Sequence, residues 1–111
     1  MDGDKDIFCK IISGETDTKF MFEDDDLAVF ADIMPKAPVH YRVVSKKHIP
    51  AINEANEQDI QLLGKMVLAG KKAAEKLEIQ DGYKLIFNVG KDGGQVVPHI
   101  HLHILGGWDK N

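Results

Sequence analysis

The sequence predicts an α+β domain built on a five-stranded antiparallel sheet with one short and one long helix. Five short apolar stretches are bounded by turn residues, four of them can connect without a helical crossover, and only one segment keeps helical periodicity over several turns. The length of 111 residues, with 43% hydrophobic and 29% charged residues, fits one globular domain. We expect a flexible N-terminus at residues 1–6, a single domain at 7–107 and a short tail at 108–111.

The domain is expected to begin with a helix of one or two turns. Phe8, Ile11 and Ile12 have the i, i+3, i+4 spacing of an apolar helix face, and Asp6 before them can cap the N-terminus. Gly14 fits the position just beyond the helix, where a left-handed residue often ends one. A helix this short is not stable alone, so it must pack on the rest of the domain.

The expected strands cover residues 19–23, 27–32, 40–45, 83–89 and 98–105. Three aspartates between the first two strands suit a tight connection, which predicts a β-hairpin. Pro35 and Pro38 mark a loop before the third strand, because proline lacks an N–H and fixes φ. The glycine-containing segment KDGGQ connects the last two strands.

One long helix is expected at about residues 57–77, where apolar residues recur at helical spacing. Asn56 and Asp59, three residues apart, resemble the capping pair that begins many helices. The helix lies between the third and fourth strands in the chain, so it interrupts the otherwise short connections of the sheet.

Composition and charge exclude several classes of protein. The net charge of −4, the pI near 5.7 and the scattered lysines provide no surface for gripping a nucleic acid backbone. No apolar run approaches the roughly 20 residues of a membrane helix. The lone Cys9 has no metal-ligand spacing around it and no secretory signal precedes it, so we expect a packed thiol in a reducing, cytoplasmic setting.

The strongest chemical signal is the alternation of His99, His101 and His103 with apolar residues. Successive side chains of a strand point to opposite faces, so a strand here would place the three imidazoles in one row, roughly 6.5–7 Å apart. The outer histidines would then flank the middle one closely enough to share a bound group with it.

Three interpretations of this row compete. It can be a polar strand face, a transition-metal site using neutral imidazoles, or a catalytic site in which an imidazole attacks phosphorus. Glycine pairs at residues 93–94 and 106–107 flank the row and leave backbone N–H groups unobstructed, as a phosphate cradle requires. The glycines, which include Gly94, add nothing to a metal site and therefore favour catalysis.

Side-chain parity supports a nucleotide as the ligand. On the second strand Phe30 and Asp32 share a face, so a ring able to cover a base lies near a carboxylate able to accept ribose hydroxyls. His40 and Asn88 join this polar cluster if the ends of their strands adjoin. His48, beside two lysines, is interpreted as a solvated loop residue outside the site.

These residues resemble the histidine triad (HIT) superfamily, and in particular its HINT branch of purine nucleoside phosphoramidases. The resemblance covers about residues 6–107, and its most specific stretch is GGQVVPHIHLHILGG. FCKIISGE, FADIMPKAPVH and GYKLIFNVGKDGG support it. It implies that two subunits join through the long helix and the fourth strand, so that the sheet continues across a homodimer.

The resemblance also implies an activity. The expected reaction is hydrolysis of purine nucleoside phosphoramidates or acyl-nucleotides to a nucleoside monophosphate through a nucleotidyl-histidine intermediate, with no cofactor and no metal. With an imidazole pKa near 6.5, activity is expected to fall below about pH 6. The alternative is a nucleotide-binding or zinc-binding interaction module with incidental turnover.

Individual roles follow from the matching positions. His101 stands where the family has its nucleophile, His99 and His103 where histidines contact the phosphate, and His40 where a residue supports the nucleophile. Asp32 matches the acceptor of the ribose hydroxyls. The other expected nucleotide contacts are Phe8, Ile11, Phe30, Ile33, Asn88, Gly94, Gln95 and Val96.

Val96 marks a departure from the family pattern. Some family members have a serine at this position, which helps to handle the leaving amine. The tail after Gly107 is also shorter than in members whose longer C-terminus shapes the choice of substrate.

Overall fold

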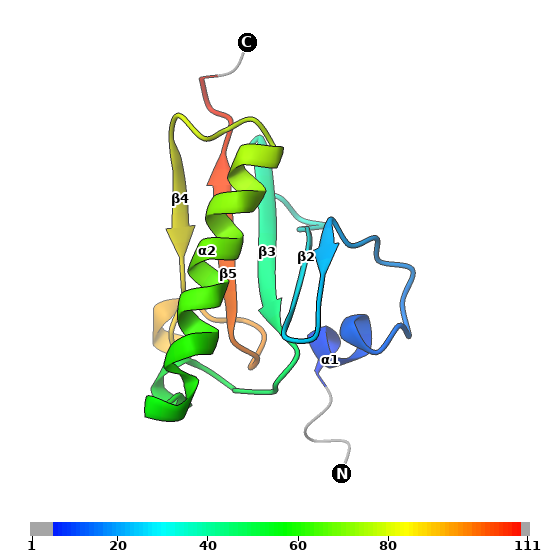
Figure 1. Cartoon of the computed structure of the whole chain (residues 1–111), viewed down its shortest axis with the longest axis vertical. Helices are drawn as coiled ribbons and strands as arrows, with labels where there is room; N and C mark the ends of the chain where they lie inside the picture. The colour runs from blue at the N-terminus through cyan, green and yellow to red at the C-terminus, as the bar shows by residue number, and fades with distance from the viewer. Residues whose placement is uncertain (1–5, 110–111) are drawn as a thin grey trace.

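The structure, a computed structural model, describes residues 6–109. It contains one five-stranded sheet in the order β1-β2-β3-β5-β4, and every neighbouring pair is antiparallel. The strands are β1 (Phe22–Glu23), β2 (Leu27–Ala31), β3 (Val39–Ser45), β4 (Tyr83–Ile86) and β5 (His101–Gly106). The long helix α2 (Ile60–Lys76) covers one face of the sheet, and the short helix α1 (Ile7–Ile12) lies near one end (Figure 1). The predicted fold class is confirmed.

Helix α1 begins as its capping residue predicts. The carboxylate of Asp6 accepts a hydrogen bond of 2.8 Å from the backbone N–H of Cys9, which satisfies a donor that the first turn leaves open. The last residue of the helix is Ile12 and Ser13 is its C-cap. Gly14 follows with φ of +86°, a conformation that glycine adopts without strain. The remaining residues of the expected flexible N-terminus, 1–5, and residues 110–111 of the expected tail lie outside the described residues.

The β1–β2 hairpin is held by its aspartates. One carboxylate oxygen of Asp24 accepts from the backbone N–H groups of Asp26 and Leu27 at 2.8 and 2.9 Å, which closes the turn. Lys65 on α2 reaches the other oxygen at 2.8 Å and also pairs with Asp26, and its hydrogen bond lowers the pKa of Asp24 to about 2. The hairpin prediction is confirmed, although β1 is shorter than expected.

Helix α2 is preceded by a single 3₁₀ turn, Glu57–Asp59. Asn56 and Asp59 form the predicted capping box around this turn, so the signal was right but the α-helix itself starts at Ile60. The buried core between α2 and the sheet consists of Leu27, Val29, Val43, Ile49, Met66, Ala73, Ala74, Ile79, Ile100, Leu102 and Ile104. In the part of the chain that the structure describes, no helix is long and apolar enough to cross a membrane.

The opposite face of the sheet is covered in part by α1. Phe8 and Ile11 of this helix pack on Ala28 and Phe30 of β2 and on Val44 of β3. The alternate residues of β2 face α2 instead, as the parity of the sequence predicts. Both faces of β2 are therefore buried, and α1 leaves the rest of this face open around the middle of β3 and β5.

The last strand starts later than expected. The prediction of a strand at 98–105 is wrong at its beginning, because β5 starts at His101. The backbone N–H of His99 bonds to the carbonyl of Val97 at 2.8 Å, and that of Ile100 bonds to the carbonyl of Ile49 at 2.7 Å. The chain thus turns before the strand, and this turn changes the direction of the His99 side chain.

Candidate active site

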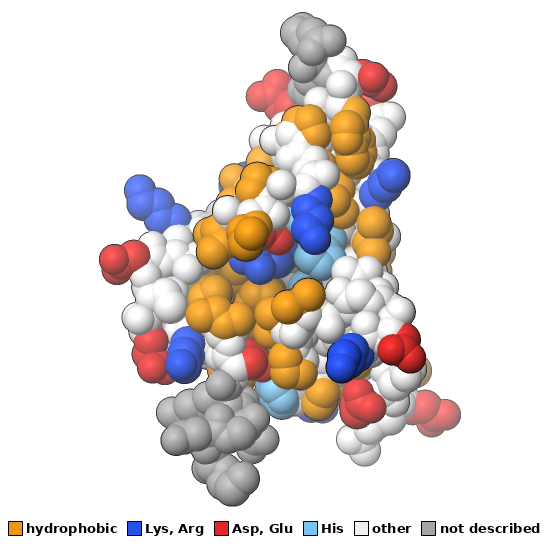
Figure 2. Space-filling view, turned by 180° about the vertical axis from the view of Figure 1, so that it is seen from behind, with side chains coloured by type: hydrophobic (Ala, Val, Ile, Leu, Met, Phe, Trp, Pro, Cys, Tyr) orange, Lys and Arg blue, Asp and Glu red, His pale blue; other side chains and the backbone are white. Residues whose placement is uncertain are grey.

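Two histidines of β5 and one of β3 meet on the sheet face that α2 does not cover. Directly opposed residues of antiparallel strands share a face, and the register pairs Phe30 with Arg42 and Arg42 with His103. His40 lies two residues before Arg42 and His101 two residues before His103, so all four polar side chains share this face. Figure 2 shows the face, where histidine, cationic and hydrophobic side chains gather around a hollow.

The ring of His101 is oriented by a backbone carbonyl. Its Nδ1 lies 2.7 Å from the carbonyl oxygen of His99, so Nδ1 carries the proton and donates it. The other nitrogen, Nε2, then keeps its lone pair. The ring is only 6% exposed and packs edge-on against Phe8 with ring centroids 4.8 Å apart. His101 is therefore a fixed imidazole whose Nε2 lone pair is free of a proton.

A second backbone group determines which ring nitrogen of His40 and of His103 carries the proton. The N–H of Lys36 donates to Nδ1 of His40 at 3.0 Å, so the proton of His40 is on Nε2. That Nε2 lies 2.9 Å from Nδ1 of His103 and donates to it. The proton of His103 is consequently on its Nε2, which makes this nitrogen a hydrogen-bond donor. The His103 ring is 4.8 Å from the His101 ring.

All three of these histidines are neutral at pH 7. Burial is the largest cause in each case: it lowers the pKa of His101 and of His40, and it lowers the pKa of His103 to about 4. A neighbouring imidazole lowers the pKa of His101 and of His103 further, Arg42 lowers the pKa of all three, and the carboxylate of Asp32 opposes these shifts.

Asp32 and Arg42 complete the polar side of the site. One oxygen of Asp32 accepts from the backbone N–H of Met34 at 2.8 Å. Its other oxygen lies 3.4 Å from Nε2 of His40 and 3.8 Å from Nε of Arg42. The sequence interpretation missed Arg42, although its position two residues after His40 on the same strand was a usable signal.

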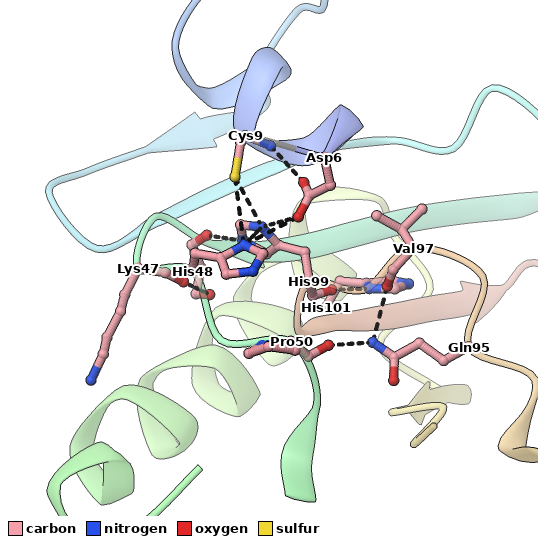
Figure 3. A network of polar contacts seen from close by, with 10 residues as sticks. Asp6, Cys9, Lys47, His48, Pro50, Gln95, Val97, His99 and His101 are labelled. Carbon is pink, nitrogen blue, oxygen red and sulfur yellow. Dashed lines mark hydrogen bonds and ion pairs between the residues drawn. The ribbon is translucent and has the colours of Figure 1, made fainter. Parts of the chain in front are cut away.

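His99 is not in the row with the other two histidines. Its ring is fully buried, and Nε2 donates to the carbonyl of Ser45 at 2.7 Å. Its Nδ1 faces Asp6, Cys9 and His48 instead (Figure 3). The expected side-by-side arrangement of three imidazoles requires a strand that includes His99, and the turn before β5 removes it. His99 contributes to the catalytic row through its carbonyl, which holds His101.

His48, which the sequence interpretation placed in solvent, belongs to a polar cluster. The Asp6 cluster, defined as Asp6, Cys9, His48 and His99, offers four ligand atoms that all lie within 4.8 Å of one another. A second, smaller group with ligand geometry, made of Asp32, His40 and His103, coincides with the catalytic face. The residues of the Asp6 cluster lie far apart in the sequence, which explains why spacing alone did not reveal it.

The loop before β5 is braced by Gln95. Its side-chain oxygen accepts from the N–H of Gly90 at 2.8 Å, and its nitrogen donates to the carbonyls of Pro50 and Val97 at 2.6 and 2.9 Å (Figure 3). The side chain that was expected to contact a nucleotide is thus engaged within the protein. Gly94 next to it adopts φ of +87°, which a side chain would strain.

Sequence and structure comparisons agree with this geometry. The family model described as "Scavenger mRNA decapping enzyme C-term binding" matches residues 5–110. An uncharacterized HIT-like protein, slr1234 of Synechocystis sp., is 44% identical over 101 residues, which are 91% of this chain and 89% of that protein. A HIT family hydrolase from Legionella pneumophila has a structure that matches with a TM-score of 0.90 at 43% identity, covering 96% of this chain and 100% of that chain.

This chain belongs to the histidine triad superfamily.

Two more distant histidine triad structures are described by what they bind. The histidine triad nucleotide-binding protein from Candida albicans has a TM-score of 0.81 at 28% identity and covers 96% of this chain and 85% of its own. A Zn-bound histidine triad family protein from Mycobacterium smegmatis has a TM-score of 0.80 at 28% identity and covers 95% of this chain and 76% of its own.

The expected apolar walls of this histidine triad protein differ in their exposure. Phe8 and Phe30 are fully buried with ring centroids 6.0 Å apart, and Ile11 is buried beside them. Ile33 and Val96 are each 88% exposed and lie at the surface rather than in the apolar cluster. Asn88 is half-buried. The structure therefore brings Phe8, Ile11 and Phe30 together and leaves Ile33 and Val96 outside this cluster.

The lowered pKa values of this histidine triad protein lead to a pH prediction. A nucleophilic His101 must be neutral, and burial lowers its pKa, so kcat/KM is expected to fall on the acid side with an apparent pKa below the ordinary 6.5 of histidine. The unfolded chain takes up protons near pH 6.5 while folded His103 does so at about 4, so the free energy of unfolding should decrease as the pH falls from 6.5 towards 4. A pH profile of kcat/KM and urea midpoints measure the two effects, and a kcat/KM profile with an apparent pKa of 6.5 or higher would contradict the first.

Proposed function

We propose that this histidine triad protein is a nucleotide hydrolase or transferase that cleaves purine nucleoside phosphoramidates or acyl-nucleotides. The observation that carries this proposal is the Nδ1 hydrogen bond from His101 to the carbonyl of His99, which leaves a nucleophilic Nε2 beside the donor of His103. The names of the hydrolase from Legionella pneumophila and of the nucleotide-binding protein from Candida albicans support a hydrolytic activity on nucleotides.

The first step is a substitution at the α-phosphorus. Nε2 of His101 forms the new bond to phosphorus, while the bond between phosphorus and the amine or carboxylate breaks. The leaving group departs with the electron pair of that bond: a carboxylate leaves as the anion, and an amine takes its proton from solvent water. The Nε2–H of His103 donates to a phosphoryl oxygen, where negative charge develops, and His40 keeps His103 in this tautomer.

The second step restores the enzyme. Water attacks the phosphorus of the nucleotidyl-histidine, the P–N bond to His101 breaks, and a nucleoside monophosphate leaves. The electron pair of the broken P–N bond returns to Nε2, which restores the neutral ring with its proton on Nδ1, and the attacking water loses a proton to solvent. In a transferase, another nucleophile replaces the water. No external oxidant, reductant or cofactor is needed for either step.

The other side chains of this face suit the rest of a nucleotide. The oxygens of Asp32 can accept the two hydroxyls of a ribose, since only one backbone donor occupies the carboxylate at hydrogen-bond distance. Phe8 and Phe30 form a buried aromatic layer beneath Arg42, which makes this end of the face different from the His103 end. The phosphate end and the base end of the proposed site are therefore chemically distinct.

A panel of substrates tests the proposal. We would measure steady-state kcat/KM for nucleoside phosphoramidates, acyl-nucleotides and dinucleoside polyphosphates that share the same nucleoside. The proposal expects phosphoramidates and acyl-nucleotides to be turned over at least about tenfold better than dinucleoside polyphosphates, a difference of roughly 1.4 kcal/mol in transition-state binding. Absence of turnover on the first two classes, or a preference for the third, would overturn it.

The Asp6 cluster favours a second function, the binding of a structural Zn²⁺ ion. Nδ1 of His99 lies 3.1 Å from the carboxylate of Asp6, 3.3 Å from Nδ1 of His48 and 3.6 Å from Sγ of Cys9. Ligands of a tetrahedral zinc are roughly 3.3–3.8 Å apart, because Zn–N and Zn–S bonds are about 2.0–2.3 Å long. The cluster therefore has the size of a zinc site before any ion is added.

The chemistry of the donors also fits. One thiol, one carboxylate and two imidazoles are ligands that Zn²⁺ accepts. The Nε2–H of His99 is fixed by the carbonyl of Ser45, so Nδ1 points into the cluster and would supply its lone pair to a bound ion, as a metal-ligating histidine requires. The Zn-bound relative from Mycobacterium smegmatis supports the choice of ion. Bound there, zinc would fasten α1 to the loop before β5, and a reducing compartment such as the cytoplasm would keep the thiol available.

A homodimer with a continuous sheet fits the exposed surface. β4 is an edge strand, so its outer N–H and C=O groups can pair with a second copy. Ile86 on this strand and Ile60, Val67 and Leu68 on α2 are large apolar side chains exposed in the single subunit. Burying them against a second subunit would remove apolar surface from water.

A further inference from the structure

Arg42 is a largely covered cation that lies between the polar side chains of the proposed site and its buried aromatic pair. It is the only arginine in the sequence, and its side chain is 13% exposed. The guanidinium carbon lies 4.9 Å from the ring centre of Phe8 and 5.0 Å from that of Phe30, so it covers both rings. An aliphatic residue at this point would pack against the two rings without burying a charge.

The guanidinium has unused hydrogen-bonding capacity. Within residues 6–109, Nε of Arg42 is the only buried side-chain nitrogen or oxygen without a hydrogen bond. Its nearest acidic partner, Asp32, is 3.8 Å from Nε, which is an ion-pair contact beyond hydrogen-bond length. A buried donor left unpaired is costly, and such groups in native proteins call for an explanation. A ligand that supplies acceptors would satisfy it.

The position of Arg42 indicates which part of a nucleotide supplies them. It lies between Phe30 and His103 in the cross-strand row, with its guanidinium over the aromatic pair. The carboxylate of Asp32 beside it would repel a phosphate, whereas it does not repel the neutral acceptors of a base. In the proposed mechanism, the phosphate binds at His101 and His103.

We infer that Arg42 reads the base and makes the enzyme selective for 6-oxopurine nucleotides, of which guanosine compounds are the common example. This inference rests on the proposed function. Guanine presents two acceptors, O6 and N7, on one edge, and a guanidinium can donate to both at once. Adenine presents N7 beside an amino group, which is a donor, and arginine has no acceptor to offer it. Adenosine compounds would therefore leave part of the guanidinium unpaired.

The size of the expected selectivity follows from this pairing. A good bidentate contact discriminates against the wrong base by about 10- to 100-fold. Hypoxanthine has the same O6 and N7 acceptors and lacks only the 2-amino group, so inosine compounds should behave like guanosine compounds. Lysine at this position would donate from a single point and restore only part of the preference.

The test compares guanosine, inosine and adenosine 5′-phosphoramidates with one leaving group. For the wild type we expect kcat/KM for guanosine and inosine to exceed that for adenosine by about tenfold or more. In Arg42→Leu the ratio should approach one, chiefly through loss of guanosine turnover, and Arg42→Lys should be intermediate. Lys72→Leu, which removes one exposed charge from α2, is the matched control and should keep the wild-type ratio.

A binding measurement separates this inference from the proposed function. Calorimetry with GMP, IMP and AMP gives the base preference without turnover, so preferential GMP binding that Arg42→Leu abolishes would support the inference even if no phosphoramidate is cleaved. An unchanged base ratio in Arg42→Leu, an equal loss for both purines, or a wild-type preference for adenine would overturn it while leaving the hydrolase proposal intact. If Arg42→Leu does not fold, the ratio in Arg42→Lys decides in the same way.

Discussion

Replacing His101 with glycine is expected to reduce turnover by about four orders of magnitude or more, the scale on which enzymes depend on their nucleophile. The Nδ1–H of His101 is held by a backbone carbonyl, which leaves the Nε2 lone pair free, and the neighbouring His103 is a fixed donor. Without the His101 ring, no covalent intermediate forms, and the remaining groups can only bind the nucleotide. Steady-state and single-turnover assays with a nucleoside phosphoramidate measure the loss.

The same variant carries its own control. Glycine removes a packed ring, so circular dichroism and calorimetric binding of a nucleoside monophosphate must show that the fold and the site persist. Free imidazole added to His101→Gly should partly restore turnover by attacking in place of the missing ring. Wild-type turnover by this variant would refute the assignment of His101 as nucleophile, and intact binding without imidazole rescue would argue that the ring acts in another way.

The second large effect is expected from removing metal. Protein purified without chelator should contain about one zinc per chain, and stripping it should lower Tm by on the order of 15 °C. A ligand at a thousand times its Kd contributes about 4 kcal/mol, and each kcal/mol corresponds to roughly 4–8 °C in a domain near this size. Metal analysis and thermal denaturation before and after treatment with a chelator measure both quantities.

Asp6→Asn is the matched variant for this experiment. Asparagine keeps the side-chain oxygen that caps α1, so helix capping is preserved while the anionic ligand is lost. We expect weaker zinc binding and a lower Tm with zinc present, but little change in the metal-free protein. Purified protein without zinc, with a Tm that is the same in chelator, would exclude the site. Zinc-free protein that keeps full turnover would exclude the alternative of a zinc module with incidental activity.

Local signals in the sequence predicted most of the fold. Asp6 before an i, i+3, i+4 pattern predicted α1, the three aspartates predicted the hairpin turn, and Asn56 with Asp59 predicted the capping box. Each of these three structures depends on interactions between residues a few positions apart, so a short stretch of sequence is enough to predict it. The parity of β2 was also predictable, because alternation along a strand is local.

The site was less predictable because its partners are distant in sequence. Alternating histidines predicted a strand from residue 98. The N–H of Ile100 instead bonds to the carbonyl of Ile49, and no local sequence pattern predicts this contact. The resulting turn sends the His99 ring to His48, 51 residues away, and to Asp6, 93 residues away. Arg42 was missed for a different reason, since a charged residue on a strand is usually solvated.

Two chemically identical rings on β5 have opposite tautomers, and main-chain groups determine both. The carbonyl of His99 accepts a hydrogen bond from Nδ1–H of His101. The N–H of Lys36 donates to His40, and His40 in turn donates to Nδ1 of His103, which keeps the proton of His103 on Nε2. A peptide group neither ionises nor disappears when a side chain is substituted. Most side-chain substitutions outside His40 should therefore leave the tautomers of His101 and His103 unchanged.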